Sequence, residues 1–246
     1  MLPEIISGVA AAGAAAGVFT YGATVAKSQL FGPTFFGVAP SGKGGKSKQL
    51  ALTYDDGPND PHTQRLLDVL DKHGVKATFF LIGRYVEQRP DIARAVAERG
   101  HVVGNHTFTH PNLIFSSKTA LKNELERTEK ALTQAVGEHS RLFRPPFGAR
   151  RPATLRVARA MGFQTIMWSV KCWDWSAPSA DYIVEKARQR IRGGDVILLH
   201  DGGHVEFGAD RAHTVAATDE LIRGYKGEGF EFVTVPQMRA TGDHSH

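Results

Sequence analysis

Short apolar runs alternate with stretches of helical periodicity over most of the chain. Seven runs predict β-strands, and they cover residues 50–54, 77–82, 101–104, 142–144, 165–170, 195–199 and 230–235. Six periodic stretches predict helices, and they cover residues 63–73, 91–99, 117–136, 154–161, 180–192 and 212–225. Regular alternation of this kind predicts an α/β fold in which right-handed crossovers join parallel strands, as a barrel or as an open doubly wound sheet.

The N-terminal part of the chain does not follow this alternation. Residues 5–26 carry no charge over about the length that crosses a bilayer, which predicts a membrane anchor or an export signal. Because alanine and glycine dominate the segment, a packed or frayed alanine-rich helix is the alternative. The first interpretation places the protein in the cell envelope, either anchored or exported.

Domain boundaries follow from local composition. Residues 1–40 form the apolar N-terminal segment, and residues 41–48 contain no apolar side chain, which is typical of a flexible linker. A single domain is expected over residues 49–240, followed by a disordered tail over residues 241–246. We expect this domain to be a monomer.

Composition excludes several classes of protein. A hydrophobic content of 41% in 246 residues is enough for a substantial buried core. The net charge of +5 favours weak attraction to anionic polymers, but no nucleic-acid-binding motif accompanies it, so we expect no nucleic-acid partner. The single cysteine, Cys172, excludes an internal disulfide and a cysteine-based metal cluster.

Polar and charged side chains follow the predicted strands at their carboxyl ends. They are Asp55 and Asp56 after the first strand, His106 and His110 after the third, Arg144 at the end of the fourth, Asp174 after the fifth, and His200 with Asp201 after the sixth. Parallel α/β folds place their binding and catalytic groups at this edge of the sheet. The pattern therefore predicts one site that is built from several strands.

Three of these residues form a candidate metal site. His106 and His110 are four residues apart, so one helical turn would bring both imidazoles to the same side, although Pro111 disfavours a regular helix. With Asp56 they offer two nitrogens and one oxygen, which suits Zn²⁺, Co²⁺, Fe²⁺ or Ni²⁺ and leaves positions open. Adjacent carboxylates hold their protons differently, so Asp55 can act as a base beside Asp56. Structural histidines and a polar turn are the alternatives.

Five motifs carry a resemblance to a known family. They are Thr-Tyr-Asp-Asp-Gly-Pro at 53–58, Gly-Asn-His-Thr-Phe-Thr-His-Pro at 104–111, Arg-Pro-Pro-Phe-Gly at 144–148, Trp-Asp-Trp at 173–175 and Ile-Leu-Leu-His-Asp at 197–201. In this order, and over residues 49–238, the chain resembles the polysaccharide deacetylases of the NodB-homology type, also called carbohydrate esterase family four. The resemblance implies a distorted (β/α)7 barrel that removes N-acetyl groups from N-acetylglucosamine in chitin-like or peptidoglycan-like glycans and releases acetate.

The resemblance also implies roles for the charged residues. Asp55 matches the general base, and Arg144 matches the residue that orients it. Asp174 matches the acid that steadies this arginine, and His200 matches the general acid. Lys171 departs from the pattern, because many relatives carry a second acid at this position.

The remaining positions concern the metal and the substrate. Asp56, His106 and His110 match the metal ligands, with zinc as the expected ion and cobalt or nickel as alternatives. Phe147 matches a residue whose backbone N–H helps to hold the oxyanion, and Trp175 and Leu198 match the walls of the pocket for the acetyl methyl group.

Alternative functions stay open from the sequence. An esterase that removes O-acetyl groups, as from acetylated xylan, and a catalytically inactive glycan-binding relative would share the fold. A non-haem Fe(II) oxygenase uses the same type of ligands, but it would need neither Asp55 beside Asp56 nor a separate acid at His200.

Overall fold

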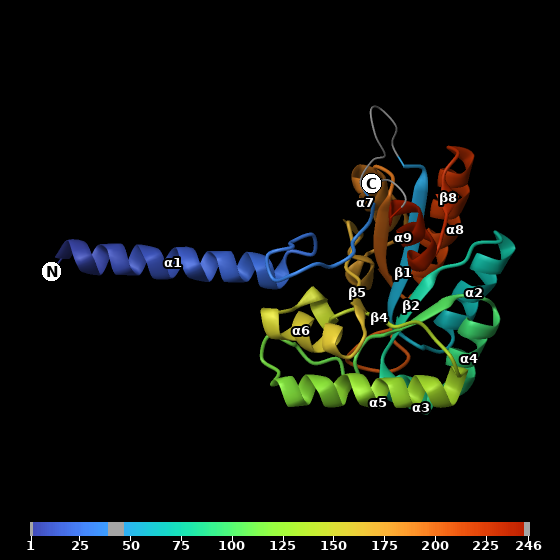
Figure 1. Cartoon of the computed structure of the whole chain (residues 1–246). Helices are drawn as coiled ribbons and strands as arrows, with labels where there is room; N and C mark the ends of the chain where they lie inside the picture. The colour runs from blue at the N-terminus through green and yellow to red at the C-terminus, as the bar shows by residue number, and fades with distance from the viewer. Residues whose placement is uncertain (1, 39–46, 244–246) are drawn as a thin grey trace.

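A parallel β-sheet surrounded by helices forms the body of the molecule, and the computed structural model describes residues 2–38 and 47–243 (Figure 1). The strands lie in the order β5-β4-β3-β2-β1-β7-β6, and β8 pairs with β1 outside this path. Their bounds are β1 Gln49–Gly57, β2 Thr78–Leu81, β3 Val102–Asn105, β4 Leu142–Phe143, β5 Gln164–Thr165, β6 Val170–Lys171, β7 Asp195–His200 and β8 Glu231–Phe232. The strand pairs are parallel, so the α/β class and the distorted barrel are confirmed.

Helices connect most of the strands, as the periodicity predicts. Their bounds are α1 Leu2–Thr24, α2 His62–Lys72, α3 Gly83–Gln88, α4 Pro90–Glu98, α5 Lys118–Val136, α6 Pro152–Ala160, α7 Ala180–Arg190, α8 Ala212–Gly227 and α9 Val235–Asp243. Two short 3₁₀ turns, η1 Pro146–Gly148 and η2 Asp174–Ser176, follow β4 and β6. The helices α3 and α9 are not among the six that the periodicity predicts, and α9 includes residues 241–243, which the sequence assigns to a disordered tail.

The strand predicted over residues 165–170 is wrong as a single element. β5 and β6 are two short strands at opposite ends of the strand order, and residues 166–169 cross from one edge of the sheet to the other. Ile166, Met167 and Trp168 are apolar because they are buried at this crossing. The sheet therefore has eight strands in the described part of the chain rather than seven, since burial in a sequence pattern does not tell a strand from a buried crossing.

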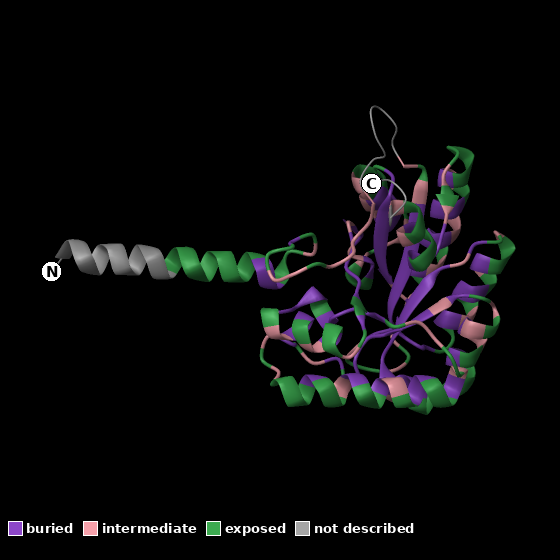
Figure 2. Cartoon of the chain, viewed as in Figure 1, coloured by how far each residue is buried: buried purple, intermediate pink, exposed green. Residues whose placement is uncertain are grey.

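β1 is the rigid centre of the sheet. It pairs with β2 on one side and β7 on the other, and its interior is fully buried (Figure 2). Leu52 and Tyr54 face the apolar core, and the Tyr54 hydroxyl forms a 3.0 Å hydrogen bond with Thr218 of α8. Side chains alternate along a strand, so Thr53 and Asp55 face the opposite side, inside the barrel.

The segment that follows α1 is packed on the domain rather than separate from it. Arg150 has a buried guanidinium whose Nη2 donates to the carbonyls of Val25 at 2.7 Å and Ser28 at 3.0 Å. Further along, Phe35 pairs with Ile166, directly after β5, and Gly37 pairs with Asp195, the first residue of β7. The fold therefore begins well before residue 49.

The helix α1 itself extends away from the domain, and its middle part is exposed (Figures 1 and 2). None of the helices in the described residues is both long enough and apolar enough to span a membrane, so the anchor predicted over residues 5–26 is not supported. The segment has the expected length, but alanine and glycine contribute little hydropathy. Most of the predicted linker, residues 41–46, lies outside the described residues, as do residues 244–246.

Candidate active site

The end of β1 directs two adjacent carboxylates into one space. Strand alternation points Asp55 into the barrel and would point Asp56 to the other side. The pairing of β1 with β2 shifts register between Asp55 and Gly57, and Asp56 has a left-handed φ of 72°. Because a bulge of this kind redirects a side chain, both carboxylates face the same site.

Asp56, His106 and His110 converge in the way that a metal requires. One ligand atom from each lies within 4.8 Å of the others, and all three residues are buried. His110 Nε2 is 3.2 Å from Asp56 Oδ1, and His106 Nε2 is 3.5 Å from the same oxygen. His106 Nδ1 donates to the Arg144 carbonyl at 2.8 Å, which leaves Nε2 as the free acceptor that faces the site.

The unpaired polar atoms show that these residues fit a cation. Asp56 Oδ1 is buried and has no hydrogen-bond partner among the described residues, which is costly unless a ligand satisfies it. Burial, followed by the neighbouring His106, lowers the pKa of His110 to about 3, so its imidazole is neutral and able to coordinate. Burial would raise the pKa of Asp56, but the nearby imidazoles outweigh it and hold the pKa well below its usual value.

The two histidines do not lie on a helical turn, as their spacing had suggested. Residues 106–110 form a loop after β3, and Thr107 and His110 have left-handed φ angles of 66° and 61°. Asn105 supports this loop through its side-chain oxygen, which accepts from the Thr107 N–H at 2.9 Å. The loop brings the imidazoles to an edge-to-face contact with ring centroids 4.9 Å apart.

Asp55 is held by a buried arginine. Arg144 Nη1 donates to Asp55 Oδ1 at 2.7 Å and to the Thr53 hydroxyl at 2.8 Å, and its Nη2 donates to the Met167 carbonyl at 3.0 Å. The guanidinium is fully buried, so this ion pair fixes the carboxylate in one orientation. The second oxygen, Asp55 Oδ2, stays 3.7 Å from His106 Nε2, beside the metal ligands.

His200 is held by Asp174, and this corrects the partner that the resemblance implied. Asp174 Oδ1 accepts from His200 Nδ1 at 2.9 Å, and Oδ2 accepts from the His200 N–H at 2.7 Å. Oδ2 also accepts from Thr214 at 3.0 Å, whereas Arg144 bonds to Asp55 instead. Burial lowers the pKa of His200, but Asp174, with help from Asp56 and Asp55, reverses the shift and raises the pKa to about 9.

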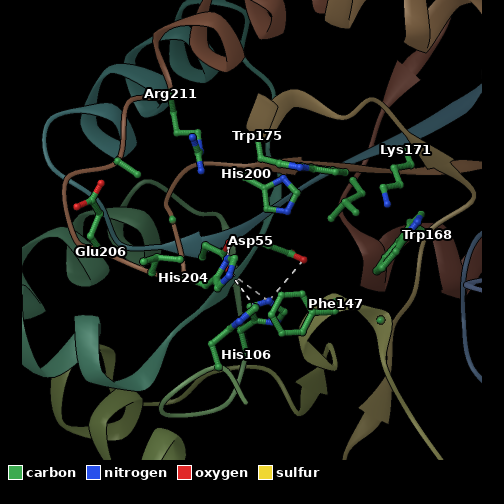
Figure 3. Close-up of a pocket in the computed structure, with 17 residues that line it drawn as sticks. Asp55, His106, Phe147, Trp168, Lys171, Trp175, His200, His204, Glu206 and Arg211 are labelled. Carbon is green, nitrogen blue, oxygen red and sulfur yellow. Dashed lines mark ion pairs between the residues drawn. The ribbon is translucent and has the colours of Figure 1, made fainter. Parts of the chain in front are cut away.

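These groups line one cavity of about 470 Å³ (Figure 3). Leu198 forms part of its wall, and Trp175, which is 39% exposed, contacts His200 edge-on with centroids 5.2 Å apart. Phe147 is 52% exposed, an unusual state for a large apolar residue, and it meets His110 edge-on at 4.6 Å. All three substrate residues named from the sequence therefore lie at the cavity.

Backbone strain concentrates at this site. Among the described residues, the non-glycine residues with left-handed φ are Asp56, Thr107, His110, Phe147 and Trp173. Each such residue costs about 1–3 kcal/mol. All five belong to or adjoin the site, so the orientation of these side chains lowers the stability of the fold.

His204 was not identified from the sequence. It follows β7 in a glycine-containing loop, where its ring stacks on His110 at 4.6 Å and its Nδ1 lies 3.7 Å from Asp56 Oδ2. The available signal was a second histidine four residues after His200. Asp201 is structural, because it accepts from the Thr63 hydroxyl at 2.5 Å, and burial raises its pKa to about 7.

Known proteins are similar to this chain in sequence and in fold. The polysaccharide deacetylase family model matches residues 42–166. A peptidoglycan-N-acetylglucosamine deacetylase of Bacillus cereus is 39% identical over 195 residues, which cover 78% of this chain and 69% of the relative. A chitooligosaccharide deacetylase of Rhizobium leguminosarum bv. trifolii is 35% identical over 200 residues, which cover 79% of this chain and 93% of the relative.

Solved structures give the same result. The crystal structure of the Bc1960 peptidoglycan N-acetylglucosamine deacetylase aligns with a TM-score of 0.76 and 36% identity, and it covers 83% of this chain and 92% of that one. A Bacillus anthracis protein described as a carbohydrate esterase family four pseudoenzyme aligns with a TM-score of 0.75 and 28% identity, over 84% and 68% of the two chains. By sequence and by structure, the chain belongs to the polysaccharide deacetylase family.

Proposed function

We propose that the chain is a metal-dependent hydrolase that removes the acetyl group from N-acetylglucosamine units of a cell-wall or chitin-type glycan and releases acetate. The observation that carries this proposal is one cavity that holds a metal-ligand set, a carboxylate beside it and a histidine across from it. Amide hydrolysis needs all three, because water must lose a proton, the carbonyl must be polarised and the amine must gain a proton.

Asp55 acts as the general base in this proposal. Arg144 fixes its orientation through the buried ion pair, and Asp55 Oδ2 lies beside the metal ligands, where the attacking water has to be. A divalent ion held by Asp56, His106 and His110 supplies Lewis acidity at the acetyl carbonyl. The backbone N–H of Phe147 adds a hydrogen bond to the oxyanion, so the side chain at this position is free to contact the sugar.

His200 acts as the general acid. Asp174 keeps it protonated at neutral pH and occupies Nδ1, so Nε2 delivers the proton to the departing amine nitrogen as the carbon–nitrogen bond breaks. Trp175 and Leu198 hold the acetyl methyl group. The presence of both Asp55 and His200 favours an active enzyme over a catalytically inactive member of the family.

The relatives that are named for peptidoglycan support a role in the cell envelope. The test is an acetate-release panel of chitooligosaccharides, peptidoglycan and acetylated xylan, run on the full chain with defined metals. We expect acetate from at least one N-acetylglucosamine glycan. Release from acetylated xylan alone would replace the proposal with an O-acetyl esterase, and release from none of the three would contradict it.

A further inference from the structure

Lys171 brings a positive charge into the cavity on the side opposite the loop that follows β7. It is the last residue of β6 and pairs in register with Leu198 of β7, so it stands beside the wall of the acetyl pocket. In Figure 3, Lys171 and Trp168 lie on one side of His200, and Arg211 and Glu206 lie on the other. The proposed chemistry uses neither Lys171 nor Arg211.

Two aromatic rings fix the position of the ammonium group. Lys171 Nζ lies 4.6 Å from the ring centroid of Trp175 and 5.6 Å from that of Trp173. An aromatic face attracts a cation that lies over it. It does not supply the oxygen or nitrogen acceptor that the ammonium N–H groups would otherwise bond to. The contact therefore positions the charge and leaves its N–H donors available.

No carboxylate neutralises this charge within the described parts of the chain. Ion pairs hold most of the buried charges at the site, such as Asp55 with Arg144, but no carboxylate oxygen lies within 4 Å of Lys171 Nζ. Burial lowers the pKa of Lys171, and no acidic group offsets the effect. A half-buried ammonium that has given up part of its water would gain a strong hydrogen bond from an anionic ligand.

The far side of the cavity carries a second cation, Arg211, together with one carboxylate, Glu206. Arg211 donates from Nε to the Gly202 carbonyl at 2.7 Å and from Nη1 to the Asp210 carbonyl at 2.7 Å, so its described hydrogen bonds use neutral acceptors. Glu206 is exposed on the same loop. Outside the proposed catalytic and metal-binding groups, the cavity thus presents two cations and one anion.

We propose that Lys171 is the core of an anion subsite that binds a carboxylate carried by the glycan next to the N-acetylglucosamine being deacetylated. This inference rests on the proposed function and narrows its substrate class. It selects peptidoglycan-type strands, which carry carboxylates on their lactyl groups or peptide stems, over uncharged chitin-type strands. The exposed aromatic ring of Phe147 offers an apolar contact to sugar rings of either type, so the charge is what distinguishes the two.

The experiment compares matched tetrasaccharides on the full-length protein. Three are peptidoglycan repeats with a free lactyl carboxylate, with the same carboxyl converted to its methylamide, or with an alanyl-glutamate stem; the fourth is chitotetraose. The variants are Lys171→Gln, Lys171→Arg, which keeps a cation, and Lys118→Gln, which removes an equal charge from the exposed start of α5. Metal content and circular dichroism show whether each variant keeps its ion and fold.

The wild type should favour a carboxylate-bearing substrate, and Lys171→Gln should lower kcat/KM on that substrate by about tenfold through KM, because a charge-assisted hydrogen bond is lost. The methylamide and chitotetraose should change by less than about twofold. Lys171→Arg should keep most of the preference, and Lys118→Gln should keep all of it. The carboxylate that binds Lys171 is identified by which substrate, the free lactyl form or the stem form, loses kcat/KM in Lys171→Gln.

Two results would overturn the subsite while leaving the deacetylase intact. In one, the wild type has the same kcat/KM on the methylamide and on chitotetraose as on the two carboxylate substrates. The other is a Lys171→Gln variant that loses the same factor on all four, since that would mean a structural role against Trp175. A wild type that releases acetate from none of the four would instead contradict the proposed function itself, and the subsite with it.

Discussion

The two halves of the cavity differ in how complete they are. On the side of β1 and β3, Asp56, His106 and His110 converge around a buried oxygen that has no partner in the described residues. On the side of β6 and β7, His200 and Asp174 satisfy each other through two hydrogen bonds of 2.9 and 2.7 Å. The metal half thus needs an ion to complete it, whereas the acid half is assembled by the chain alone.

Removal of the metal should separate the halves most strongly. Exhaustive chelation should abolish acetate release, and Zn²⁺ or Co²⁺ should restore it, because the described residues offer one convincing ligand set. Melting temperature should fall as well, since a ligand that binds only the folded state stabilises it. Elemental analysis verifies that the protein is metal-free. Full activity in a verified metal-free sample would contradict the mechanism.

Substitution of the adjacent carboxylates should divide their roles within the metal half. Asp55→Asn should keep the ion and lose about 10²- to 10⁴-fold in rate, the usual contribution of a positioned general base. Asp56→Asn should lose affinity for the ion itself. Metal titration and acetate release, measured on both variants, provide the comparison. If both variants bind metal like the parent and are equally active, the two assignments are wrong.

Loss of the acid should depend on the leaving group. His200→Ala should slow release from an N-acetyl substrate by about 10²-fold or more, because the amine leaves only when protonated. An aryl acetate should slow much less, since a phenolate leaves without a proton. Unchanged metal content and fold serve as the control. Equal loss on both substrates would mean that His200 holds the oxyanion or positions the substrate instead.

Asp174→Asn should reduce the rate of acetate release least of these substitutions at low pH. The reduction should become larger as the pH rises. The parent keeps His200 protonated up to its pKa of about 9, so the activity should fall above that pH. Without the Asp174 carboxylate the pKa should drop, because burial lowers it, and the basic limb of the pH–rate profile should move to lower pH. An unmoved basic limb would assign it to a different group.

The sequence predicts which strands carry chemistry, because buried runs and the polar residues that end them are local features. Asp55, Asp56 and His200 were placed at strand ends in this way, and the structure brings them to one cavity. The partner of Asp174 could not be predicted, since residue order does not tell whether a carboxylate reaches Arg144 or His200. The left-handed backbone at His110 could not be predicted either, because it depends on the surrounding fold.

The packing of the N-terminal segment on the domain could not be predicted for a related physical reason. Composition separates an alanine-rich segment and a glycine-lysine stretch from the α/β pattern, so the domain was placed from residue 49. Apolar side chains such as Phe35, Phe36 and Val38 pack against the core, but they are too few and too widely spaced to form a strand or helix pattern. The other contacts use backbone carbonyls, such as those of Val25 and Ser28, which every residue type possesses, so they leave no side-chain pattern.

Arg150 sets a limit on how the chain can be shortened for laboratory use. A recombinant form that starts at residue 41 would remove the carbonyls of Val25 and Ser28 and leave a buried guanidinium without these acceptors. The Arg150 backbone N–H would also lose the Ala23 carbonyl, which it binds at 3.1 Å only three residues after Phe147. Poor solubility or loss of activity in a shortened protein could then come from damage to the loop around Phe147 rather than from the substitution or condition under study. Expression of a form that starts before Ala23 avoids this ambiguity.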